Sequence, residues 1–134
     1  SMVNYRENEE IFRAVNLARQ ALSRITTQLR TAQSVDPSAP ANECSLVTST
    51  GQDITYRFDS DNNTLYLITN DDATDDDYIL CENVAAMTFT KNTTTVESVV
   101  YVKSVQISIT VTNDAGDFQQ TVSAAVVMRR NLDY

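Results

Sequence analysis

The sequence predicts an α+β protein in which one long N-terminal α-helix packs on an antiparallel β domain. Near the start of the chain, apolar residues recur every three or four positions, as they do on one face of a helix. After Asn42 the pattern changes to alternation with a period of two, interrupted by short polar turns. Because the helix precedes all the strands, the order is typical of α+β folds and not of alternating α/β folds. We expect one antiparallel sheet, with two small sheets as the alternative.

The helix is expected to run from about Glu7 to about Val35, since no proline or glycine interrupts this segment. Acidic residues come first and arginines later, which complements the helix dipole. Glu9 and Arg13 have the i,i+4 spacing of an ion pair. Asp36-Pro37 should end the helix, because a residue before proline avoids the α region. The apolar stripe has heptad-like spacing and consists of Ile11, Val15, Ala18, Leu22, Ile25, Leu29 and Ala32.

Two further apolar residues, Phe12 and Leu17, fall on either side of this stripe. The stripe can pack on strands of the same chain, but residues outside it need another partner. The helix is therefore expected to be apolar on one face only near Leu29 and over a wider part of its surface near its start.

Eight runs after the helix are predicted as strands, with short connections that favour antiparallel pairing. They cover residues 44–50, 53–59, 63–69, 77–84, 85–91, 96–102, 104–112 and 118–130. The polar DSDNN segment at 59–63 predicts a hairpin turn, and Gly116 is the natural position for a positive φ in the NDAGD turn. Residues 1–36 thus form a helix and residues 37–134 a β region, within one structural domain.

Composition excludes several classes of function. The chain has 134 residues, a formal net charge of −8 and no histidine. An acidic surface argues against nucleic acid or anionic membrane as the main partner of this domain. Without histidine, Ser-His-Asp and Cys-His systems are excluded, and the two glycines stand alone, so no phosphate-binding loop is present. We therefore expect no enzyme, no catalytic residue and no cofactor.

The acidic segment NDDATDDDY, residues 70–78, allows two interpretations. Several clustered carboxylates suit a calcium loop, but a solvated loop between two strands is the interpretation that we prefer. The DSDNN segment begins like an EF-hand loop and lacks its glycine and its final glutamate. No metal site is assigned on the sequence.

Cys44 and Cys81 lie in or beside strand-like segments. They are either a disulfide in an oxidising compartment or two buried thiols. Spacing alone leaves both interpretations open.

The order of these segments resembles the exported domain of type IV pilin-like proteins. The similarity covers ARQALSRITTQLRTAQSV, CSLVTS, ITYRFDSDNNTLYL, VQISITVT and TVSAAVVMRRNL. It is closest to PilW-type minor pilins and to the J-type minor pseudopilin of type II secretion. The family's cleavage motif, a Gly-Phe-Thr-Leu-Ile-Glu-like start before an apolar half-helix, is absent from this sequence. A Ser before Met is typical of a tag-cleavage remnant, so Ser1-Met2 leads us to expect a trimmed piece of a longer chain.

The resemblance implies a structural subunit of a pilus or pseudopilus. Such proteins are membrane-anchored prepilins, cleaved and N-methylated before assembly, and exposed in the periplasm or at the cell surface of bacteria. Their partners are other pilin-like subunits and the inner membrane. The resemblance places Ile25, Leu29 and Ala32 against the subunit's own sheet, and export favours a Cys44–Cys81 disulfide. The residues implied at the subunit interface are Ile11, Phe12, Val15 and Leu17.

Two other classes of function compete with this one. The first is a surface adhesin module that binds a sugar or calcium through loops such as 71–77. The second is a self-contained coiled-coil oligomer that assembles through the seam from Ile11 to Ala32.

Overall fold

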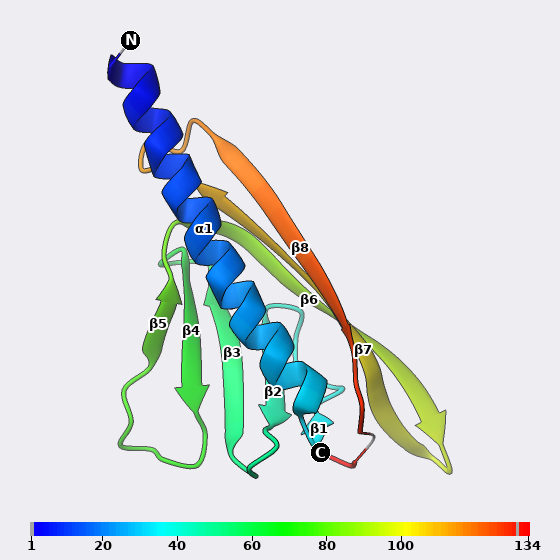
Figure 1. The fold of residues 1–134 in the computed structure, drawn as a ribbon. Coiled ribbons are helices and arrows are strands. Elements are labelled where there is room, and N and C mark those ends of the chain that lie inside the picture. Colours follow the sequence, from blue (N-terminus) through cyan, green and yellow to red (C-terminus); the bar gives the residue numbers. More distant parts are fainter. Residues whose placement is uncertain (1, 131) are drawn as a thin grey trace.

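The chain folds as one N-terminal helix against two antiparallel sheets, which confirms the α+β prediction (Figure 1). A computed structural model describes residues 2–130 and 132–134, so the expectation for Ser1 lies outside the described residues. The helix is α1 (Met2–Thr31). The first sheet has the order β1-β2-β3-β4-β5, and the second has the order β6-β7-β8. The strands are β1 (Ser34–Val35), β2 (Glu43–Val47), β3 (Asp53–Asp59), β4 (Thr64–Thr69), β5 (Tyr78–Cys81), β6 (Val84–Val96), β7 (Val99–Thr112) and β8 (Gln119–Val127).

Helix α1 begins and ends earlier than the sequence predicted. It starts at Met2, and it ends at Thr31, well before Asp36-Pro37. The segment after the helix instead joins the first sheet, where Ser34 pairs with Val47. The backbone N–H of Gln33 also donates to the carbonyl of Val47 at 2.8 Å. Pairing with β2 thus gives hydrogen-bond partners to backbone groups of Gln33 to Val35 that a further helical turn would otherwise have paired. The helix therefore ends at Thr31.

The apolar stripe of α1 packs on the strands of its own chain, as predicted. Ile25, Leu29 and Ala32 are each 0% exposed. The helix lies along β8 and β7, with β5 at its other side (Figure 1). A coiled coil through this stripe is therefore wrong for this molecule, because the strands already cover the seam.

The hairpins follow the turn residues. Residues 53–59 pair with 64–69 across the DSDNN turn, and Gly116 has a φ of 75°, both as predicted. The runs at 96–102 and 104–112 were predicted as two strands, but 99–112 forms the single strand β7. Glu97 and Ser98 both have positive φ and form the tight turn between β6 and β7.

The predicted disulfide is absent, and Cys44 and Cys81 are free, buried thiols. Cys44 lies in β2 and Cys81 in β5, so β3 and β4 separate them in the sheet. Three strand spacings of about 4.8 Å each exceed the Cα separation of roughly 7 Å that a disulfide tolerates. Both side chains belong to the hydrophobic core, and the interpretation as buried thiols replaces the disulfide.

We expect both thiols to be unreactive in the folded protein and reactive after unfolding. Burial raises the pKa of Cys44 to about 12 and that of Cys81 to about 11, so neither forms a thiolate at pH 8. Labelling with iodoacetamide without a reductant, followed by mass spectrometry, should add no label to native protein and two labels in denaturant. A denatured chain that takes up no label, with a mass two daltons lower, would instead restore the disulfide.

Candidate subunit interface

The four residues predicted for a subunit interface do not share one environment. Phe12 is 67% exposed and Leu17 is 44% exposed, so both are open to a partner. Val15 is buried in the core and Ile11 is half-buried against it. The prediction is wrong for Val15, because its place on the stripe directs it to the sheet of its own chain. Phe12 and Leu17 therefore define the accessible apolar surface of α1.

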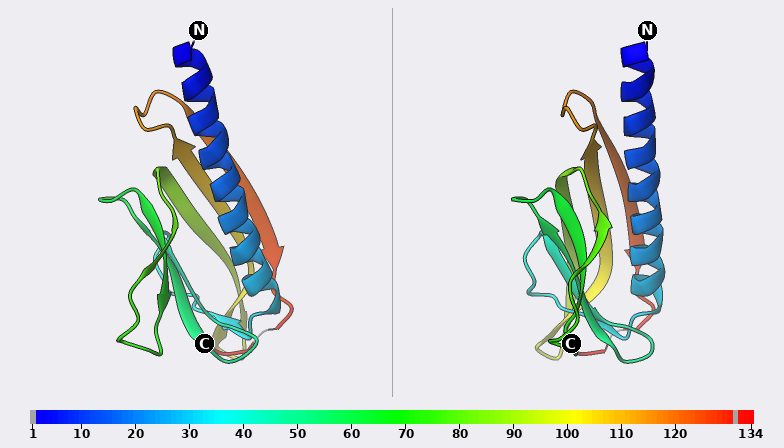
Figure 2. Two further views of the ribbon diagram at one scale, coloured as in Figure 1. Left: turned by 60° about the vertical axis from the view of Figure 1, so that its left-hand side comes forward. Right: turned by 90° about the vertical axis from the view of Figure 1, so that its left-hand side faces the viewer.

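The first turns of α1 extend past the ends of the strands (Figure 2). The rest of the helix lies against the sheets, and the two sheets diverge from each other beneath it. An overhanging helix end has no strand to pack on.

A groove separates the middle of α1 from the edge strand β5. It has a volume of about 330 Å³. On the β5 side it is lined by the apolar side chains of Tyr78 and Ile79, which are 60% and 49% exposed. The Arg24 guanidinium lies over the Tyr78 ring, 5.9 Å from its centre, which is a cation–π distance. The residues that line the groove are Leu17, Gln20, Ala21, Arg24, Tyr78, Ile79 and Leu80. Tyr78 and Ile79 were missed by the sequence analysis, although three apolar residues directly after an acidic run were a usable signal.

Beneath this groove lies Tyr56, which is completely buried and whose hydroxyl makes no hydrogen bond of good geometry. Burial raises the pKa of Tyr56 to about 12, while the nearby charge of Arg24 lowers it in part. Arg24 thus lies between a buried phenol and the exposed Tyr78 ring. The positively charged guanidinium of Arg24 therefore lies at the surface of the groove.

Beyond Leu17 the groove continues as a smaller hollow of about 130 Å³ beside the start of the helix. Here Glu10 accepts a hydrogen bond from the backbone N–H of Asp114 at 3.4 Å. Glu82 also lines this hollow, so its character is mainly acidic. The β5 side of α1 is therefore acidic near Glu10, apolar around Leu17 and basic at Arg24.

Ion pairs are few in the described part of the chain. Arg13 pairs with Glu9 at 3.3 Å, which confirms the predicted i,i+4 pair. Arg57 pairs with Asp77 at 3.7 Å. Among residues 8–130 and 132–134, whose side chains the structure describes, these are the two ion pairs, so most exposed charges there have no partner of opposite sign.

The carboxylates of the acidic β4–β5 loop hold its backbone conformation. Asp71 accepts a hydrogen bond from the backbone N–H of Asp53 at 2.8 Å. Asp72 accepts from both the hydroxyl and the backbone N–H of Thr74, and the hydroxyl bond in particular lowers the pKa of Asp72. Within the described residues, no group of three or more carboxylate or cysteine ligands is arranged to hold a metal ion. The carboxylates of Asp71 and Asp72 therefore form hydrogen bonds within the protein.

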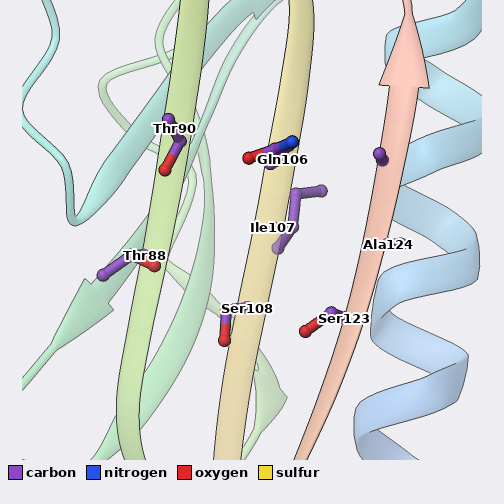
Figure 3. Close-up of a pocket in the computed structure, with 8 residues that line it drawn as sticks. Thr88, Thr90, Gln106, Ile107, Ser108, Ser123 and Ala124 are labelled. Carbon is purple, nitrogen blue, oxygen red and sulfur yellow. The ribbon is translucent and has the colours of Figure 1, made fainter.

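Another hollow lies on the outer face of the second sheet, turned away from α1 (Figure 3). It measures about 420 Å³. Its lining contains no charged and no aromatic residue, and consists of Thr88, Thr90, Gln106, Ile107, Ser108, Ser123, Ala124 and Ala125. Hydroxyl and amide groups alone select weakly among polar ligands, so we assign no ligand to this face.

Helix α1 is too polar to cross a bilayer, and none of the helical residues described in the structure forms a membrane span.

Comparisons with protein-family models, with curated proteins and with solved structures gave no match.

Proposed function

We propose that this chain is the exported domain of a minor pilin or pseudopilin, a structural subunit of a type IV pilus or of a type II secretion pseudopilus. One observation carries the proposal. A 30-residue helix packs its later turns on the sheets of its own chain and extends its first turns beyond them (Figure 2). This arrangement suits a spine helix that continues toward a membrane anchor and contacts neighbouring subunits.

The charge and the exposed residues support the same proposal. Phe12 is a large aromatic side chain, 67% exposed, on a helix whose opposite face is buried. Exposed aromatic and arginine residues are enriched at the centres of protein interfaces. Leu17 and Tyr78 form a second exposed apolar surface along the groove with Arg24 beside it, so this part of the chain offers a neighbouring subunit both apolar and basic contacts.

The natural coding sequence upstream of Met2 tests the proposal directly. We expect a prepilin cleavage site followed by about twenty apolar residues, the length that spans a bilayer. An upstream sequence without both features would end the proposal.

At the bench, full-length protein carrying Phe12→Glu should fail to enter the sheared filament fraction of its host. The cause is a charge placed in the proposed contact, where it cannot be solvated or paired. The matched control is Val127→Glu, because Val127 is 72% exposed on another part of the surface. Both purified domains should melt within a few degrees of wild type, since neither side chain is buried. Equal incorporation of the two variants would show that Phe12 is no contact residue.

A further inference from the structure

After Glu10, the solvent-facing side of α1 carries only positive charge. Between Ile11 and Thr31 the helix contains four arginines and no carboxylate, although the whole chain has a net charge of −8. All four arginines are exposed, and only the first of them is in an ion pair among the described residues. We call Arg13, Arg19, Arg24 and Arg30 the arginine face, which extends around the exposed half of the helix from Arg13 and Arg24 on the β5 side to Arg19 on the β8 side.

Arginine is the basic residue best suited to a protein contact. Its planar guanidinium binds a carboxylate through two parallel hydrogen bonds and is less strongly hydrated than an ammonium group. The helix contains no lysine. Apolar side chains also flank the arginine face at Leu17 and Tyr78, and they would exclude water from pairs formed by Arg24.

The complementary charge lies in the β4–β5 loop. Residues 71–77 contain five aspartates, all exposed, and the one ion pair of this loop in the described structure joins Asp77 to Arg57. Hydrogen bonds to Asp71 and Asp72 fix the loop backbone. Asp75 and Asp76 remain without an ion-pair partner among the described residues, at the centre of the loop.

The two surfaces come nearest to each other at Arg24, which lies over the ring of Tyr78 directly after the loop but forms no ion pair with the loop. The β4–β5 loop is at the end of the molecule opposite the N-terminus of α1, as both views show (Figures 1 and 2). No ion pair joins the loop to the helix within the described residues. Opposite charges that a single copy does not pair are available to pair between copies.

We propose that the β4–β5 loop of one copy binds the arginine face of α1 in the next copy, head to tail. Such a contact joins two different patches, so each bound copy still presents one free patch of each kind. The inference rests on the proposed function, in which α1 contacts other subunits, and it names the surfaces that meet. Charge complementarity identifies a second copy as the occupant, because this chain itself carries the acidic patch that the arginine face requires.

The test compares self-association of the wild-type domain with that of two charge-reversed variants, by sedimentation velocity at low and high salt. Wild type should associate as its concentration rises in 20 mM salt and should dissociate in 500 mM salt, because the Debye length falls with ionic strength. Arg19→Glu/Arg24→Glu and Asp75→Lys/Asp76→Lys should each weaken association about tenfold or more. Circular dichroism should show native helix content in both variants, since the changed side chains are exposed.

The decisive sample is an equimolar mixture of the two variants. Association should return, because one variant keeps the wild-type loop and the other keeps the wild-type arginine face. The matched control, Arg129→Glu/Arg130→Glu, makes the same change of charge at exposed residues outside the arginine face and should associate like wild type.

Three results would overturn the inference. They are a wild-type domain that stays monomeric at low salt, a control variant that loses association equally, and a mixture that stays monomeric. A wild-type monomer would point to an acidic segment of another protein as the occupant. None of these results bears on the incorporation of the Phe12→Glu variant, so failure of the inference is separable from failure of the proposed function.

Discussion

Leu29→Ala should lower the free energy of unfolding by about 3 kcal/mol. Leu29 is 0% exposed and belongs to the core between α1 and the sheets, so truncation leaves a cavity that rigid strands cannot refill. The loss combines the transfer free energy of the missing carbons with the cost of that cavity. Urea unfolding followed by circular dichroism measures the change, with the slope m expected to stay constant.

Leu17→Ala is the matched control, because it makes the same chemical change on the same helix at a side chain that is 44% exposed. Its cost should stay below about 1 kcal/mol, since neighbours and water close the smaller gap. Equal losses in the two variants would mean that α1 is not anchored through its C-terminal turns. The comparison therefore tests the packing on which the spine-like arrangement depends.

The elements that the sequence predicted well are those fixed by local pattern. The apolar residues of the stripe that contains Ile25 and Leu29 recur with the period of a helix, so they lie on one face. In the structure this face is buried. Turn chemistry located the hairpin between β3 and β4, and Gly116 has the predicted positive φ. Each of these depends on residues close together in the chain.

The predictions that failed depend on partners distant in sequence. The helix was expected to continue to Val35, but pairing of Ser34 with Val47 in β2 ends it earlier. The disulfide was favoured only because the resemblance implies export, and the strand order separates Cys44 from Cys81. Local periodicity contains no information on which strands become neighbours.

The interface residues divide in the same way. Phe12 and Leu17 were identified because they break the helical stripe, which is a local signal. Tyr78 completes the groove only because β5 is the edge strand beside α1. The order of charges along the helix was visible in the sequence, but only the structure shows that Arg19, Arg24 and Arg30 form no ion pair among the described residues.

Raising the pH from about 9 to about 12 should destabilise the fold, with Cys44 as one main cause. Burial raises the pKa of this thiol from 9.0 to about 12, opposed in part by the positive charge of Lys91. Between these values the unfolded chain has released the proton and the folded chain still holds it. Stability is therefore complete below pH 9 and falls by about 1.4 kcal/mol per pH unit above it, or about 4 kcal/mol in all for this group.

Other buried groups change the size of the effect but not its direction. Burial raises the pKa of Cys81 to about 11 and that of Tyr56 to about 12, so both add to the loss. Lys91 has the opposite effect on stability, because burial lowers its pKa. As the pH rises, the folded chain releases this proton at a lower pH than the unfolded chain does, which favours the folded state. Lys91 also donates to the carbonyls of Pro40 and Glu43, at 2.9 and 2.8 Å, and deprotonation weakens these bonds.

Cys44→Ala isolates the thiol, because Cys81, Tyr56 and Lys91 remain in both chains. The free energy of unfolding, measured by urea titration from pH 8 to pH 11, should fall less steeply in the variant, by up to about 1.4 kcal/mol per pH unit between pH 9.5 and 11, the slope that one proton gives. Below pH 8.5 the two curves should run parallel, offset only by the packing lost with the sulfur atom. If the two chains lose stability at the same rate above pH 9.5, Cys44 does not keep its proton in the folded state, and its site in the core must be more open to water than its burial indicates.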